Sequence, residues 1–179
     1  MRKTISVFIA VVILCLTFAG CGKSGSKPFQ AEAAVTLEQL NTDPRFVARG
    51  FLEAVLSGDK SMYLKCYPDC LTEGEDASLF DYFDSYKDLE VFNSDIKGTM
   101  CAGTLDVSME KGFDEAIYRS QISSATGINY NDIGQMKIVQ VNVLFANEEE
   151  SDNAVASYIV YEFDGSWYMY DVYTPEIDT

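Results

Sequence analysis

The sequence predicts an α+β domain in which N-terminal helices pack on a curved antiparallel sheet. Apolar residues recur at helical spacing in the first half of the folded part and alternate with period two in the last third. The helical segments come first and the later strands are joined by short turns, an order typical of helices on one face of an antiparallel sheet. The 179 residues are 47% hydrophobic, which suffices for the core of one domain.

Residues 1–20 predict a secretory signal. Arg2 and Lys3 precede an uncharged apolar run, Val7 to Leu16, and small residues follow it. The run is shorter than the roughly 20 residues that a membrane-spanning helix needs.

The stretch Leu16-Thr17-Phe18-Ala19-Gly20-Cys21 resembles the signal of bacterial lipoproteins. The resemblance implies cleavage before Cys21, a diacylglyceryl group on its sulfur, and a location on the extracytoplasmic face of the cell membrane. Two acyl chains hold a protein stably in a bilayer. Cleavage leaves 11 basic and 28 acidic residues, a net charge of 11 − 28 = −17. An anionic membrane repels such a body, so the lipid must hold it.

Residues 21–42 predict a lipidated flexible linker, since Gly22, Ser24, Gly25, Ser26 and Pro28 are linker residue types. The α+β domain is expected to occupy residues 43–179.

The first helices have clear boundary signals. Asp43 and Pro44 predict a helix start, and an apolar stripe follows from Val47 to Leu56. Ser57-Gly58-Asp59 ends this helix, and a short helix then runs to Pro68. The apolar residues of 79–86 predict a further amphipathic helix.

The strands follow from alternation. Residues 101–109 alternate weakly, and 113–126 predict a helix with Asp114 and Glu115 in its first turn. Residues 128–134 read as a loop, and strands are expected at 137–145, 155–163 and 167–173. Asp164-Gly165 predicts a tight turn between the last two.

Two segments are similar to a known family. Residues 51–59 resemble the helix-then-Gly-Asp start of many small bacterial lipoprotein domains, and residues 163–172 look like their closing hairpin. Those domains belong to the nuclear transport factor two-like superfamily, whose cone-shaped fold wraps a bent sheet around a helix. The resemblance covers about residues 44–175, and residues 70–97 depart from it.

Composition excludes several classes of function. The sequence has no histidine, which rules out Ser/His/Asp and Cys/His catalysis and histidine metal sites. A net charge of −15 makes nucleic acid an unsuitable partner. No cofactor and no metal site are predicted.

Three cysteines remain after the signal and the anchor are set aside: Cys66, Cys70 and Cys101. An extracytoplasmic location permits disulfides, and the spacing leaves every pairing among the three open. An odd number leaves at least one thiol over within a monomer.

The last strand suggests a pocket in the cone. Alternation places Trp167 and Asp171 on one strand face, where Tyr158 or Tyr161 could donate hydrogen bonds to an Asp171 of raised pKa. The alternative is that Asp171 lies in water at a sheet edge and the tyrosines serve packing.

We expect a membrane-tethered, non-enzymatic binding module that takes a small ligand or an envelope protein. One alternative is a small isomerase- or dehydratase-like enzyme that uses Asp and Tyr in the cone. The other is a structural spacer or assembly component, such as a homodimer.

Overall fold

The computed structural model describes residues 32–72, 83, 96–106, 113–146 and 151–173. Three predicted segments lie outside the described residues: the signal, residues 21–31 of the linker, and the 79–86 helix except for Phe83. Phe83 is helical and buried against Tyr63, with ring centroids 5.0 Å apart.

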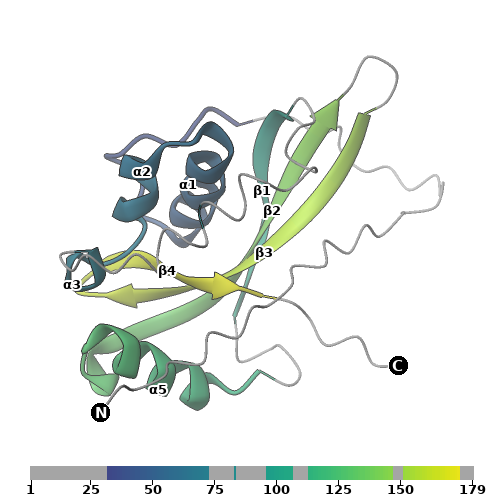
Figure 1. Cartoon of the computed structure of the whole chain (residues 1–179). Helices are drawn as coiled ribbons and strands as arrows, with labels where there is room; N and C mark the ends of the chain where they lie inside the picture. Colours follow the sequence, from purple (N-terminus) through teal and green to yellow (C-terminus); the bar gives the residue numbers. More distant parts are fainter. Residues whose placement is uncertain (1–31, 73–82, 84–95, 107–112, 147–150, 174–179) are drawn as a thin grey trace, which may run out of the picture.

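The sheet is a four-stranded antiparallel meander, as Figure 1 shows. Its strands are β1 (Ile96–Asp106), β2 (Ile133–Ala146), β3 (Ser151–Phe163) and β4 (Ser166–Val172), paired in sequence order. The long strands β2 and β3 are bent, and the α+β class is confirmed. Asp164 and Gly165 form the β3–β4 turn with φ of 51° and 72°, the left-handed values that such a tight turn requires.

Helix α1 (Pro44–Ser57) lies across all four strands. The side chain of Asp43 accepts a hydrogen bond from the Arg45 N–H, and Pro44 supplies a φ suited to the first turn. Gly58 ends the helix with φ of 72°, a conformation that favours glycine. The short helices α2 (Lys60–Lys65) and α3 (Asp69–Thr72) follow it.

Helix α5 (Glu115–Thr126) packs on the opposite face of the sheet from α1 (Figure 1). Asp114 caps it, one position before the first turn in which we expected that residue. The turn η3 (Tyr130–Asp132) then leads into β2, which begins four residues before its predicted start. The expectation that all helices share one face is therefore wrong for α5.

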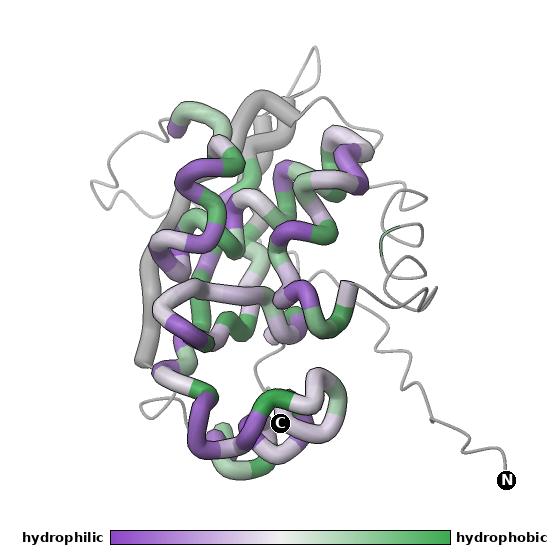
Figure 2. The backbone as a smooth tube through the Cα atoms, turned by 90° about the vertical axis from the view of Figure 1, so that its left-hand side faces the viewer, coloured by the Kyte–Doolittle hydropathy of each residue, from purple (hydrophilic) through white to green (hydrophobic). Residues whose placement is uncertain are grey.

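Two separate clusters of buried side chains explain the two covered faces. On the α1 face, residues of α1 and α2 pack against Val139, Val141 and Val160. On the α5 face, Ile122 packs against a second set: Ile128, Ile133, Met136, Ile138, Ile159 and Tyr161. The hydrophobic and hydrophilic positions that produce these faces interleave along the chain in Figure 2. Because neighbouring residues such as Ile138 and Val139 are both fully buried, these stretches of strand are covered on both sides.

Residues 32–42 form a strap that packs on α1, so the flexible-linker prediction does not hold for them. Leu40 is fully buried, and its Cδ1 would lie 2.2 Å from a Cβ added at Gly50. The strap also covers the outer edge of β4. There the Trp167 N–H donates to the Asn41 carbonyl at 2.9 Å, and Asn41 Nδ2 donates to the Trp167 carbonyl at 2.8 Å. The folded body thus begins at or before residue 32.

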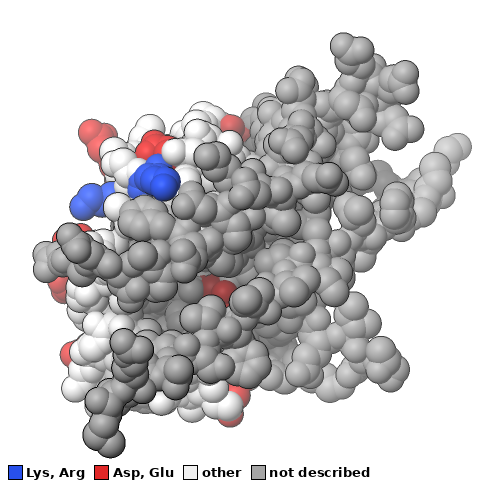
Figure 3. Space-filling view, in the orientation of Figure 1, with Lys and Arg blue, Asp and Glu red and all other residues white. Residues whose placement is uncertain are grey.

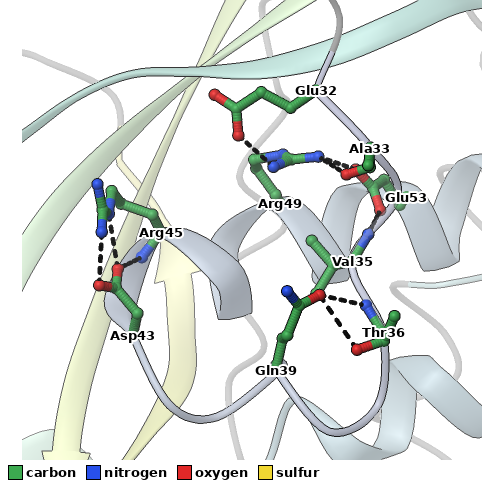
Figure 4. A network of polar contacts seen from close by, with 9 residues as sticks. All are labelled: Glu32, Ala33, Val35, Thr36, Gln39, Asp43, Arg45, Arg49 and Glu53. Atoms are coloured by element: carbon green, nitrogen blue, oxygen red, sulfur yellow. Dashed lines mark hydrogen bonds and ion pairs between the residues drawn. The ribbon is translucent and has the colours of Figure 1, made fainter.

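Arg49 holds the start of the strap, as Figure 4 shows. This side chain is 2% exposed and donates hydrogen bonds to the carboxylate of Glu32, the carbonyl of Ala33 (2.7 Å) and the carboxylate of Glu53 (2.9 Å). The other oxygen of Glu53 accepts from the Val35 N–H at 2.8 Å. Strap and helix are therefore joined by charge-assisted hydrogen bonds from an arginine that is shielded from water.

Candidate binding groove

The four predicted pocket residues do not come together in one site. Trp167 and Tyr158 face α1, and the Tyr158 ring packs edge-on against Phe51 with centroids 5.5 Å apart. Tyr161 faces α5. Tyr158 and Tyr161 are an odd number of positions apart on one strand, so they point to opposite sides of the sheet.

Asp171 is displaced from its expected face by a β-bulge. Ile159 pairs with Asp171 while Val160 pairs with Met169, so Tyr170 is the extra residue. As a result Val172, rather than Asp171, joins Trp167 and Met169 on the α1 face. The face assignment from strict alternation is wrong beyond Met169.

The chemistry of Asp171 follows from this position. Asp171 is an exposed residue whose carboxylate accepts a hydrogen bond from the Val172 N–H at 2.7 Å. Partial desolvation raises its pKa, and the hydrogen bond from Val172 opposes the rise. Burial, with smaller effects from Asp171 and Tyr118, raises the pKa of Tyr170 to about 12.

The hydroxyl of Tyr161 is buried, and in the described part of the chain it has no hydrogen-bond partner. Burial raises its pKa. By contrast, the Tyr67 hydroxyl on the α1 face donates to the Tyr63 hydroxyl at 3.3 Å. The buried Tyr67 hydroxyl on the α1 face is therefore hydrogen-bonded, whereas the buried Tyr161 hydroxyl on the α5 face has no partner among the described residues.

Cys66 and Cys70 are both free thiols, so the small bridged loop between them is not formed. Cys66 is fully buried and donates to the Met62 carbonyl at 3.4 Å, and burial raises its pKa. Cys70 is exposed on α3. Cys101 belongs to β1, and because Cys66 and Cys70 are free, neither of the predicted pairings with it is formed.

An open groove of about 490 Å³ lies between α5 and the first residues of β2. We call it the bulge groove. Its volume falls in the range of about 300–1,000 Å³ that is usual for small-molecule sites. The groove is lined by Glu115 and Arg119 of α5, by residues 133–137 of β2, and by Glu162 of β3.

A second bulge shapes this groove. Ile133 pairs with Phe163 and Met136 with Tyr161, so Gly134 and Gln135 together lie opposite Glu162. A Cβ added at Gly134 would lie 3.0 Å from both the Cβ and the Oε2 of Glu162. Glycine at 134 therefore allows the Glu162 side chain to lie close against the β2 backbone.

Arg119 fixes the α5 side of the groove. Its Nη1 and Nη2 donate to the carbonyls of Ile133 and Gly134, the second at 2.6 Å, and its Nε donates to Glu115 at 2.7 Å. Consecutive carbonyls of a regular strand point to opposite edges, so the bulge is what brings both within reach of one guanidinium. The described pairing of β1 with β2 ends at the pair Asp106–Lys137. Beyond this pair, Arg119 is the donor to the β2 carbonyls in place of β1.

Sequence reasoning missed this groove because it placed Gly134 at the end of a loop. A glycine just ahead of a strongly alternating strand was the available signal, since glycine in a strand often marks a bulge. Within the described residues, no group of three or more Cys, Asp or Glu side chains could hold a metal ion. The groove therefore offers charge pairing and hydrogen bonding from carboxylates, an amide and backbone groups.

No family model, curated protein or solved structure matches this chain. Among the described helices, none is both long enough and apolar enough to cross a bilayer.

Proposed function

We propose that the protein is a lipid-anchored extracytoplasmic binding module whose recognition site is the bulge groove. The sequence around Cys21 supports the anchor, as does the position at which the folded body begins. From Cys21 to Glu32 is a reach of at most about 40 Å. A body attached by so short an arm stays close to the bilayer while its groove remains open to ligands.

The element order also supports a cone of the nuclear transport factor two-like kind. A helix lies across a bent antiparallel meander, and one further helix joins β1 to β2. In such a fold the sheet forms the wall and α1 fills the interior. The bulge groove then lies outside the filled interior, on the side of α5.

The observation that carries the binding function is the construction of the groove rim. Arg119 is committed to Glu115 and to two β2 carbonyls, which fixes α5 against the bulge. Gly134 and Glu162 pack closely against each other and line the open groove beside this fixed backbone. A recess with a fixed rim suits a binding site, because little ordering is needed on association.

The described geometry favours binding over Asp–Tyr catalysis. A general base needs hydrogen-bond reach to the group it serves. Tyr158 and Tyr161 lie on opposite faces of β3, and Asp171 is exposed with a backbone N–H of its own strand as partner. The predicted acid–base set would require these groups to converge.

One experiment in a bacterial host tests anchor and groove together. A photoreactive amino acid replaces Gln135 on the groove rim or, as a control, Leu37, which is 61% exposed on the strap. We expect a discrete adduct from position 135 and none of that mass from 37. Cys21→Ser should release the protein from the membrane fraction or leave it unprocessed, whereas Cys15→Ser should leave anchoring unchanged.

Normal processing and membrane retention of the Cys21→Ser protein would reject the lipid anchor. Equal adducts from positions 135 and 37, or none from 135, would reject the groove as the recognition site.

A further inference from the structure

Charge is distributed unevenly along the chain that follows Cys21. Residues 22–72 contain six basic and six acidic residues, a net charge of 6 − 6 = 0. Residues 73–179 contain five basic and 22 acidic residues, so they carry 5 − 22 = −17. The neutral part is the one that adjoins the predicted lipid. An anionic bilayer therefore repels residues 73–179, whereas it exerts little net force on the strap, α1 and α2.

The exposed basic residues beside the strap are paired with acidic ones. Arg45, 55% exposed, forms an ion pair with Asp43 at 2.8 Å. Lys65, 64% exposed, lies 3.7 Å from Asp69, and its carbonyl accepts a hydrogen bond from Asn41 of the strap at 3.1 Å. On the face drawn in Figure 3, the visible Lys and Arg side chains lie over α1 and α2, with acidic side chains beside them. The surface next to the strap is thus close to neutral.

The outer surface of the strap is mostly uncharged. Its exposed uncharged residues include Ala33, Ala34, Thr36, Leu37 and Gln39. Leu37 is 61% exposed, the highest value for a large apolar side chain in the described part of the chain. We call the exposed residues of the strap, together with Arg45 and Lys65, the strap face. It combines low net charge with one protruding apolar side chain.

The lipid arm joins the body at the strap face. From Cys21 to Glu32 the chain reaches at most about 40 Å, and a flexible arm of this length has a root-mean-square extension of roughly 20 Å. This extension exceeds the Debye length of about 8 Å at physiological ionic strength. The arm therefore keeps the body near the bilayer and leaves it free to turn, so surface charge and apolar contact decide which face approaches the lipid.

We infer that the strap face is the surface that the body turns toward an anionic lipid bilayer, with Leu37 at the lipid interface. This inference rests on the proposed lipid anchor and specifies how the anchored body is oriented. Leu37 gains by leaving water, and repulsion keeps the acidic remainder of the chain away from the bilayer. Because α5 lies on the opposite face of the sheet from α1, the bulge groove then faces away from the bilayer, where a ligand can reach it.

Photo-cross-linking to lipid tests this orientation. The full-length, lipidated protein is reconstituted in vesicles of equal parts phosphatidylglycerol and phosphatidylethanolamine. Benzoylphenylalanine replaces Leu37 or, as the matched control, Ile117, which is 54% exposed on α5. We expect phospholipid adducts at least tenfold more abundant from position 37 than from position 117. The phospholipid mass distinguishes this adduct from the ligand adduct expected at Gln135.

Two charge variants test the electrostatic part of the inference in the protein that carries the probe at position 37. Lys65→Glu should lower the yield of lipid adduct at least twofold, because it adds negative charge to the strap face. Glu38→Gln removes an exposed carboxylate from the strap and should raise the yield. Neither variant should change the yield in phosphatidylcholine vesicles, since that lipid has no net charge.

Equal lipid adducts from positions 37 and 117, more from position 117, or none from position 37 would overturn the inference. An adduct yield that responds to neither charge variant in the anionic vesicles would overturn it as well. Cys21→Ser separates the two failures. If that variant is released or unprocessed while positions 37 and 117 react alike, the anchor stands and only the orientation is wrong. If it is processed and retained normally, the proposed anchor fails with the inference.

Discussion

The two faces of the sheet are covered in different ways. On the α1 face, a 14-residue helix with eight buried residues lies across every strand, and the strap and α2 complete the cover. On the α5 face, a 12-residue helix buries only Ile122 fully among its described side chains. The first face is built for stability, and the second leaves room for a groove beside its helix.

Each face also has an arginine that ties one segment of the chain to another. Arg49, 2% exposed, holds the strap, whereas the side chain of Arg119 is 20% exposed and holds the β2 bulge. Both guanidiniums bind backbone carbonyls and a glutamate four residues away in the helix. The difference in burial should decide how much each contributes, because water can replace an exposed partner and cannot reach a buried one.

Arg49→Met should produce the largest effect. It leaves the Glu53 carboxylate and the Ala33 carbonyl without their donor in surroundings that water barely reaches. Removing one partner of a buried ion pair costs at least about 3 kcal/mol. Because Glu32 is partly exposed to water, we expect a cost close to this lower limit. Arg119→Met should cost about 1 kcal/mol, since its carbonyl partners border an open groove.

Urea unfolding of the two variants measures this contrast. Arg45→Met, at a position 55% exposed, is the matched control and should change the free energy of unfolding by less than about 0.5 kcal/mol. Equal losses for Arg49→Met and Arg119→Met would contradict the distinction between the faces.

The next contrast concerns two buried tyrosine hydroxyls, whose removal should change the free energy of unfolding in opposite directions. Tyr161→Phe removes a hydroxyl that is buried without a partner in the described chain, so it should stabilise the protein by about 1 kcal/mol. Tyr67→Phe removes the hydrogen bond to the Tyr63 hydroxyl and should destabilise it by a similar amount. Thermal unfolding at one pH measures both, and a loss of stability in Tyr161→Phe would show that its hydroxyl has a partner.

Local signals explain how much of this fold could be predicted. The cap at Asp43, the stop at Gly58 and the turn at Asp164-Gly165 each depend on one or two residues, and all three lie where the sequence placed them. Helix α5 and the strands of the meander were also predicted, with ends that differ by a few residues. In these segments, propensity and pattern agree with the tertiary structure.

The candidate site could not be predicted because it depends on register and on tertiary contacts. A bulge changes side-chain parity without altering composition. The bulge between β3 and β4 moved Asp171 off the expected face, and the bulge between β2 and β3 placed Gly134 against Glu162. The residues before the strap have a linker-like composition. Within the strap, however, Val35 and Leu40 are buried against α1. Side-chain alternation along β3 is sufficient, by contrast, to predict that Tyr158 and Tyr161 lie on opposite faces of the sheet.

The smallest effects concern two carboxylates whose pKa values shift in opposite directions. The side-chain hydrogen bond from Arg45 lowers the pKa of Asp43, whereas desolvation raises that of Asp171. A lowered folded-state pKa gives stability that is present above the unfolded value and is lost as pH falls through the folded one. A raised pKa has the opposite sign, so the penalty of the charged Asp171 disappears as pH falls through its folded-state value.

Relative to Asp43→Asn, which keeps a capping side chain, the wild type should therefore be more stable near neutral pH, by less than about 1 kcal/mol because the carboxylate is partly exposed. That advantage should disappear below about pH 4. Relative to Asp171→Asn, the wild type should gain stability as pH falls towards about 4, which is above the range in which the Asp43 advantage is lost. Urea unfolding at several pH values measures both differences in the free energy of unfolding. If both differences change with pH in the same direction, the environment described for one of the two carboxylates is incorrect.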